Sequence, residues 1–127
     1  MVGTIESYLD EVNNLTSYVL KGKVEADQII TSIKAFYQGK PTKYVLWNSS
    51  QAQVAHLYNN DIERIVNTVE NYADRTIVMK TALVFSEDVA FGLGRMFELI
   101  GEIEGLPPRF KSFRNIDEAK KWLGIIN

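Results

Sequence analysis

The chain of 127 residues contains no cysteine, so disulfides, thiolate metal sites and a cysteine nucleophile are excluded. It also lacks any apolar run approaching the roughly 20 residues that a membrane-spanning helix needs. The first residues have neither the basic start nor the apolar core of a secretory signal. We therefore expect a cytoplasmic protein without a membrane span.

An excess of charge of one sign is missing as well. Fourteen Lys and Arg face 16 Asp and Glu, for a net charge of −2, and the two signs are interspersed. A nucleic-acid interface normally has a basic patch, and the modest basic cluster near the C-terminus is diluted by Asp117 and Glu118. We predict no nucleic-acid binding. Apolar residues at 46% and charged ones at 24% are typical of one soluble globular domain, here spanning residues 1–127.

The clearest pattern in the chain is a buried strand followed by a long helix. Residues 81–85 form a short apolar run with β-branched and aromatic members, which favours a strand. Ser86 is placed to cap the next helix, with Glu87 and Asp88 at its positive end, and Gly105 to end it in the left-handed conformation. Apolar residues at helical spacing predict its buried face: Val89, Leu93, Met96, Phe97, Ile100 and Ile103.

The N-terminal third predicts a hairpin and a helix. Strands over residues 5–9 and 15–21 are separated by so few residues that they must pair antiparallel, and Gly22 breaks the second strand. A helical stripe over residues 26–37 ends at Gly39. Residues 44–47 then give the best candidate for a central strand.

The rest of the chain supplies a loop, two helices and a strand. Residues 48–59 have little regular pattern and predict a loop, after which Asn60 and Glu63 resemble a capping pair. A last short strand covers residues 110–113, and Asn115 caps a terminal helix that Gly124 closes.

The predicted order is β-β-α-β-α-β-α-β-α. Strands that alternate with helices imply parallel neighbours, and the hairpin adds an antiparallel edge. We therefore expect an α/β fold with a mixed, mostly parallel sheet of about five strands and four helices. Periodicity leaves open whether the helices cover one face or both.

Two motifs carry a family resemblance. Residues 91–98 read Phe-Gly-Leu-Gly-Arg-Met-Phe-Glu, and residues 113–123 read Phe-Arg-Asn-Ile-Asp-Glu-Ala-Lys-Lys-Trp-Leu. With them the chain resembles the small bacterial SpoIIAA-like proteins, also described as STAS/CRAL-TRIO-like, and the element order agrees over nearly the whole chain. The resemblance implies a non-enzymatic regulatory or protein-interaction domain of unassigned process, with a protein partner or self-association as a homodimer.

Relatives of this family, the anti-sigma factor antagonists, carry a phosphorylatable serine in an Asp-Ser-Ser-Gly-like turn after a central strand. Ser49 and Ser50 occupy the corresponding place here, with Asn48 and Gln51 replacing the acid and the glycine. The resemblance therefore makes the two serines candidate phosphoacceptors. The alternative is that small polar residues simply fill a turn.

The lipid-binding CRAL-TRIO branch implies an alternative function, the binding of a small apolar ligand. Trp47, Tyr58, Phe91 and Phe97 are the candidates for lining a small pocket, unless they are core residues. The full set of candidates for binding a ligand or partner comprises Trp47, Asn48, His56, Tyr58, Phe91 and Arg95.

Catalytic and metal-binding patterns do not emerge. His56 is the only histidine and has no acids at ligand spacing. Gly92 and Gly94 lie a turn inside the helix instead of before it, so a phosphate loop is disfavoured and close approach to another backbone, within the chain or across a dimer, is predicted. Phe91 and Leu99 flank that helix as possible dimer contacts. We predict no enzyme activity, no cofactor and no metal.

Overall fold

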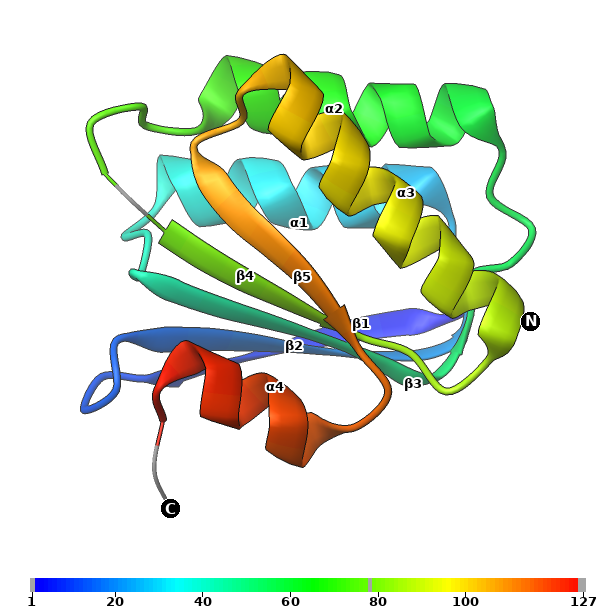
Figure 1. Cartoon of the computed structure of the whole chain (residues 1–127), viewed down its shortest axis with the longest axis horizontal. Coiled ribbons are helices and arrows are strands. Elements are labelled where there is room, and N and C mark those ends of the chain that lie inside the picture. The colour runs from blue at the N-terminus through cyan, green and yellow to red at the C-terminus, as the bar shows by residue number, and fades with distance from the viewer. Residues whose placement is uncertain (1, 78, 126–127) are drawn as a thin grey trace.

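The computed structural model describes residues 2–77 and 79–125 (Figure 1). The elements follow the predicted order. They are β1 (Thr4–Asp10), β2 (Leu15–Lys23), α1 (Ala26–Gln38), β3 (Tyr44–Gln53), α2 (Asn59–Tyr72), β4 (Met79–Val84), α3 (Asp88–Glu104), β5 (Pro108–Phe113) and α4 (Ile116–Leu123).

The five strands form one sheet in the order β1-β2-β3-β4-β5. β1 pairs antiparallel with β2, and all other neighbours are parallel, as the sequence predicts. Helices α1, α2 and α3 lie on one face of the sheet, and α4 lies on the other (Figure 1). The helices therefore cover both faces unequally, and a separate hydrophobic core fills each side of the sheet.

The hairpin between β1 and β2 turns through Asn14, whose φ of 54° places it in the left-handed region. The Asp10 carboxylate accepts hydrogen bonds from Asn13 N (3.1 Å) and Nδ2 (2.8 Å), which lower the pKa of Asp10. The prediction that Gly22 breaks β2 is wrong, because β2 runs to Lys23. Gly22 instead takes a φ of 74° within the strand, beside the backbone of Gly3.

Two of the predicted helix caps are also wrong. Ser86 does not cap α3, because its hydroxyl donates to the Ser50 carbonyl (2.8 Å) and Glu87 is the N-cap residue. Asn60 does not cap α2 either, because the N-cap residue is Tyr58, two residues earlier, and Asp61 accepts from Tyr58 N (3.0 Å). The other predicted helix ends are confirmed: Asn115 accepts from the Glu118 N–H (2.9 Å), and left-handed glycines end α3 and α4, namely Gly105 and Gly124.

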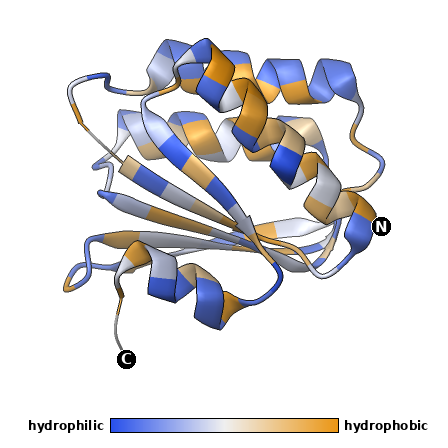
Figure 2. Cartoon of the chain, in the orientation of Figure 1, coloured by the Kyte–Doolittle hydropathy of each residue, from blue (hydrophilic) through white to orange (hydrophobic). Residues whose placement is uncertain are grey.

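The predicted buried face of α3 is rotated from the observed one. The buried residues of α3 are Ala90, Gly94, Phe97 and Gly101, whereas Val89 is 63% and Ile103 is 72% exposed. Small residues let the helix lie close to the sheet. As Figure 2 shows, α3 has hydrophobic residues over more of its length than α1 or α2, which explains why periodicity placed the face incorrectly.

The two glycines of α3 play different parts. A Cβ on Gly94 would lie 2.4 Å from Phe85 Cε2 and 2.5 Å from Ser112 Oγ, while a Cβ on Gly92 would meet open space. Within the chain the predicted approach to another backbone is therefore wrong: Gly94 lies close to side chains, and Gly92 has no close neighbour. An approach across a dimer stays a prediction.

Candidate functional site

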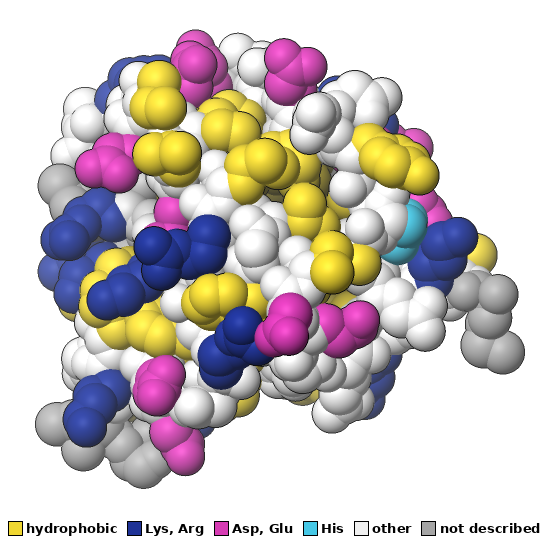
Figure 3. Space-filling model, turned by 45° about the vertical axis from the view of Figure 1, so that its right-hand side comes forward, with side chains coloured by type: hydrophobic (Ala, Val, Ile, Leu, Met, Phe, Trp, Pro, Cys, Tyr) yellow, Lys and Arg dark blue, Asp and Glu magenta, His cyan; other side chains and the backbone are white. Residues whose placement is uncertain are grey.

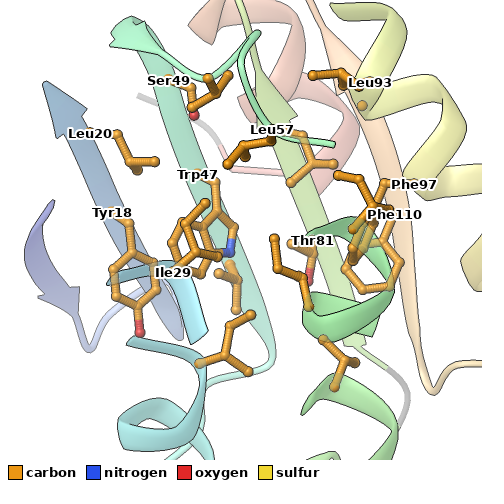
Figure 4. Close-up of a pocket in the computed structure, with 18 of the residues that line it drawn as sticks. Tyr18, Leu20, Ile29, Trp47, Ser49, Leu57, Thr81, Leu93, Phe97 and Phe110 are labelled. Atoms are coloured by element: carbon orange, nitrogen blue, oxygen red, sulfur yellow. The ribbon is translucent and has the colours of Figure 1, made fainter. Parts of the chain in front are cut away.

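An apolar cavity of about 120 Å³ lies between the sheet and the three-helix layer (Figure 4). Side chains from β2, β3, β4 and β5 line it on the side of the sheet. Side chains from α1, α2, α3 and the segment before α2 line it on the side of the helices. Most of them are aliphatic or aromatic. The described residues that line the cavity include none with a charged side chain.

The cavity lies over the paired part of β3 and β4 and extends past it to Ser49 and Phe85. β3 pairs with β4 only from Tyr44 to Asn48, whereas its remaining residues pair with β2 alone. Ser86 follows β4 and donates to the Ser50 carbonyl, which satisfies one backbone acceptor that β4 no longer reaches.

The prediction of a loop over residues 48–59 is wrong for its first half, since β3 runs to Gln53. A β-bulge explains the missed strand. The register moves from Val19 opposite Asn48 to Lys21 opposite Gln51, so Ser49 and Ser50 together oppose one residue of β2. The extra residue shifts the alternation of inward-facing and outward-facing side chains, so the sequence of β3 shows no continuous period-two pattern.

Burial distinguishes the two serines. Ser49 is 6% exposed and lines the cavity, in line with Trp47 two residues earlier on β3. Ser50 is half-buried, and its N–H and hydroxyl both donate to Asn48 Oδ1, at 3.1 and 2.7 Å. Phosphorylation of either serine stays a prediction.

An aromatic group forms one wall of the cavity. The rings of Tyr18 and Trp47 stack with centroids 4.1 Å apart and an interplanar angle of 16°. Burial raises the pKa of Tyr18 to about 12. Burial, and secondarily the charge of Tyr18, raises the pKa of Tyr37 to about 12. Both phenols are therefore neutral at physiological pH and can donate or accept hydrogen bonds.

The remaining predicted site residues lie outside the cavity lining. His56 Nε2 lies 3.4 Å from Glu25 Oε2, and the nitrogen has no hydrogen bond of good geometry. Tyr58 is 75% exposed. The Arg114 guanidinium lies over the Phe91 ring at 4.3 Å. Arg95 Nε pairs with a neighbouring carboxylate on α3, at 3.7 Å. Binding through any of these residues stays a prediction.

Exposed apolar side chains also follow one side of α3. Val89, Leu99 and Ile103 are each more than half exposed and lie at helical spacing with half-buried Met96. We call these four residues the α3 ridge. Figure 3 shows hydrophobic side chains that gather around a hollow on this side of the molecule.

Within the described ranges, no three His, Cys, Asp or Glu side chains lie close enough to hold a metal ion. Among the same residues, the helices are too short or too polar to cross a bilayer.

Comparison with solved structures identifies the architecture. An uncharacterised protein of the DUF3478 family from Shewanella loihica, described as having a SpoIIAA-like fold, matches 95% of this chain over 93% of its own, with a TM-score of 0.59. The fold is SpoIIAA-like. The two sequences are 12% identical, so the SpoIIAA-like likeness is one of fold alone. No family model and no curated protein matches the sequence.

Sequence reasoning missed most of the cavity. Trp47 and Phe97, candidates either for a pocket or for the core, line the cavity, but Tyr18 and Thr81, on β2 and β4, were not singled out. A signal was present: inward-facing positions of neighbouring strands recur every second residue, and Tyr18 pairs with Trp47 in the parallel register. That register becomes visible only when the strand order is known.

Proposed function

We propose that the protein is a non-enzymatic binding domain for a small apolar ligand, held in the cavity between the sheet and the three helices. The observation that carries this proposal is the cavity of about 120 Å³, whose described lining residues include none with a charged side chain. Protein interiors normally contain few voids larger than a water molecule. An apolar cavity of about 150 Å³ in another protein binds benzene, so the volume suits a ligand of that size.

The two tryptophans provide a test, because they lie in different cores. Trp47 lines the cavity, whereas Trp122 packs beside Phe113 on the α4 face. Toluene should change the fluorescence of a Trp122→Phe protein, in which only Trp47 remains. The matched Trp47→Phe protein, which keeps Trp122, should respond little.

A saturable fluorescence change of Trp47 alone supports ligand binding. Equal fluorescence changes in both proteins would indicate unspecific partitioning of toluene, and no change in either would mean that the cavity does not admit toluene. Either result would contradict the proposal.

The α3 ridge favours a second candidate function, the binding of a partner protein or a second copy of this chain. Three of its four apolar side chains are more than half exposed, which is typical of interaction surfaces when such residues are contiguous. Ile103→Glu should abolish self-association in sedimentation experiments if the ridge is a dimer contact. The control is Glu102→Gln on the neighbouring face. A concentration-independent monomer mass for the unmodified protein would exclude the homodimer.

Regulation by phosphorylation is a further element of this proposal, and the fold favours Ser50 over Ser49. Ser50 is half-buried, while Ser49 is buried in the cavity wall. Intact-mass analysis of protein from its native cells, with Ser50→Ala and Ser49→Ala as paired variants, tests this. Unmodified protein under all growth conditions would exclude the switch.

A further inference from the structure

We propose that the ligand of this cavity is a small uncharged molecule with a hydrogen-bonding group, of the class of single-ring aromatic alcohols. This inference rests on the proposed function, because it names the ligand chemistry of the same cavity. It follows from the hydroxyl groups, the absence of lining charge and the shape of the aromatic wall.

Three of the residues that line the cavity carry a hydroxyl group and are well buried. Tyr18, Ser49 and Thr81 are 5%, 6% and 5% exposed. In the described part of the chain, side-chain hydroxyl hydrogen bonds are formed by other residues, which are Tyr8, Thr16, Thr42, Ser50, Thr68, Thr76 and Ser86. The cavity hydroxyls thus have no protein partner there.

A hydroxyl that borders an apolar cavity gains from a hydrogen-bonding partner, because polar groups in an apolar environment are unfavourable without one. These hydroxyls differ from the buried Ser112 Oγ, which is unpaired in a closed contact with α3, because they border open space. Figure 4 shows Ser49 and the Tyr18 hydroxyl at opposite ends of the cavity, with Thr81 across the Trp47 indole from Tyr18. The hydroxyl of a ligand could therefore form a hydrogen bond at more than one place in the cavity.

The absence of charged side chains in the lining limits the charge of the ligand. An ion buried without a partner is strongly disfavoured. A hydroxyl, by contrast, can donate to or accept from Ser49, Thr81 or Tyr18, and the Trp47 indole N–H adds a donor. The lining therefore excludes carboxylates and ammonium groups and matches a neutral alcohol.

The aromatic wall indicates a ring. Trp47 stacks on Tyr18, and in Figure 4 its indole lies between Tyr18 and Thr81. Aromatic rings favour offset-stacked or edge-to-face contacts, which a six-membered ring could make here. Together with the volume of about 120 Å³, this points to a ligand with one ring.

Calorimetric titration with p-cresol, toluene and benzoate tests the inference, because the three probes share one ring and differ in polarity. We expect p-cresol to bind about tenfold more tightly than toluene, since one satisfied hydrogen bond contributes about that factor. Benzoate should not bind.

Thr81→Val removes one hydroxyl and keeps the shape. It should weaken p-cresol binding by about tenfold, leave toluene binding unchanged and raise the urea midpoint of the ligand-free protein. Thr68→Val is the matched control: it lies on α2 outside the cavity, and its hydroxyl donates to the Arg64 carbonyl (2.8 Å). It should lower the urea midpoint without changing the preference for p-cresol.

The outcomes separate the two proposals. Equal affinity for p-cresol and toluene, or tightest binding of benzoate, would overturn the inference and leave apolar-ligand binding intact. If none of the three probes binds, the proposed function fails and the inference with it. Should Thr81→Val not fold, the ratio of p-cresol to toluene affinity in the unmodified protein decides, and a ratio near one overturns the role of the hydroxyls.

Discussion

At the scale of single residues, Gly92 and Gly94 are two residues apart in the sequence but have different packing environments. Gly94→Ala places a methyl group against Phe85 and Ser112, and overpacking of this kind costs about 1–3 kcal/mol of unfolding free energy. Gly92→Ala meets open space and should stabilise the helix by up to about 1 kcal/mol, because alanine favours helix. Urea unfolding of the two variants measures both effects. Equal shifts would contradict the assigned packing.

Individual residues were also the hardest to assign from the sequence. Ser49 and Ser50 were placed in a loop because the bulge removes the alternation that reveals a strand. Tyr18 and Thr81 belong to separate strands, and only the register of the sheet brings them to one cavity. The pattern of residues within one strand contains no information on which residues of other strands lie beside it.

At the scale of elements, helix ends decide how closely sequence and structure agree. Asn115 accepts from Glu118 N as predicted, and Asn115→Ala should cost about 1 kcal/mol of unfolding free energy. Asn60 lies inside the first turn of α2, so Asn60→Ala should change the unfolding free energy by less than about 0.5 kcal/mol. Chemical denaturation distinguishes the two. A comparable loss for both variants would restore Asn60 as the cap.

The element order, the five-stranded mixed sheet and the four helices were all predictable from apolar runs, turn residues and capping signals. The buried side of α3 was not, because apolar residues surround much of that helix and its sheet-facing positions hold alanine and glycine. Small residues on a helix indicate that it packs closely against the sheet only when the position of the neighbouring strand is known. Sequence therefore predicts which elements form more reliably than which side of α3 faces inward.

At the scale of the whole molecule, the buried tyrosines predict a loss of stability in alkali. The pKa values of Tyr18 and Tyr37 are raised from 10.0 to about 12, so the folded state favours the neutral phenols. Their contribution is complete below pH 10 and is lost as the pH rises through 12. The loss is on the order of 2 kcal/mol for Tyr18 and smaller for half-buried Tyr37, where water screens the charge.

Denaturation midpoints measured across this alkaline range, for the unmodified protein and for Tyr18→Phe, provide the test. The phenylalanine variant should lose less stability than the unmodified protein over the same interval. Parallel curves would show that the Tyr18 phenol ionises as readily in the folded protein as in the unfolded one.

β1 is an edge strand of the sheet, and this affects how the molecule behaves in concentrated solution. The outer backbone hydrogen-bonding groups of β1 are available to strands of other molecules, and its carboxylates, Glu6 and Asp10, repel such neighbours. Asp10 keeps its negative charge further into acid than an ordinary aspartate, because Asn13 lowers its pKa. Acidification that neutralises both groups should therefore turn clear solutions turbid through strand-to-strand stacking, and mild acid alone should not.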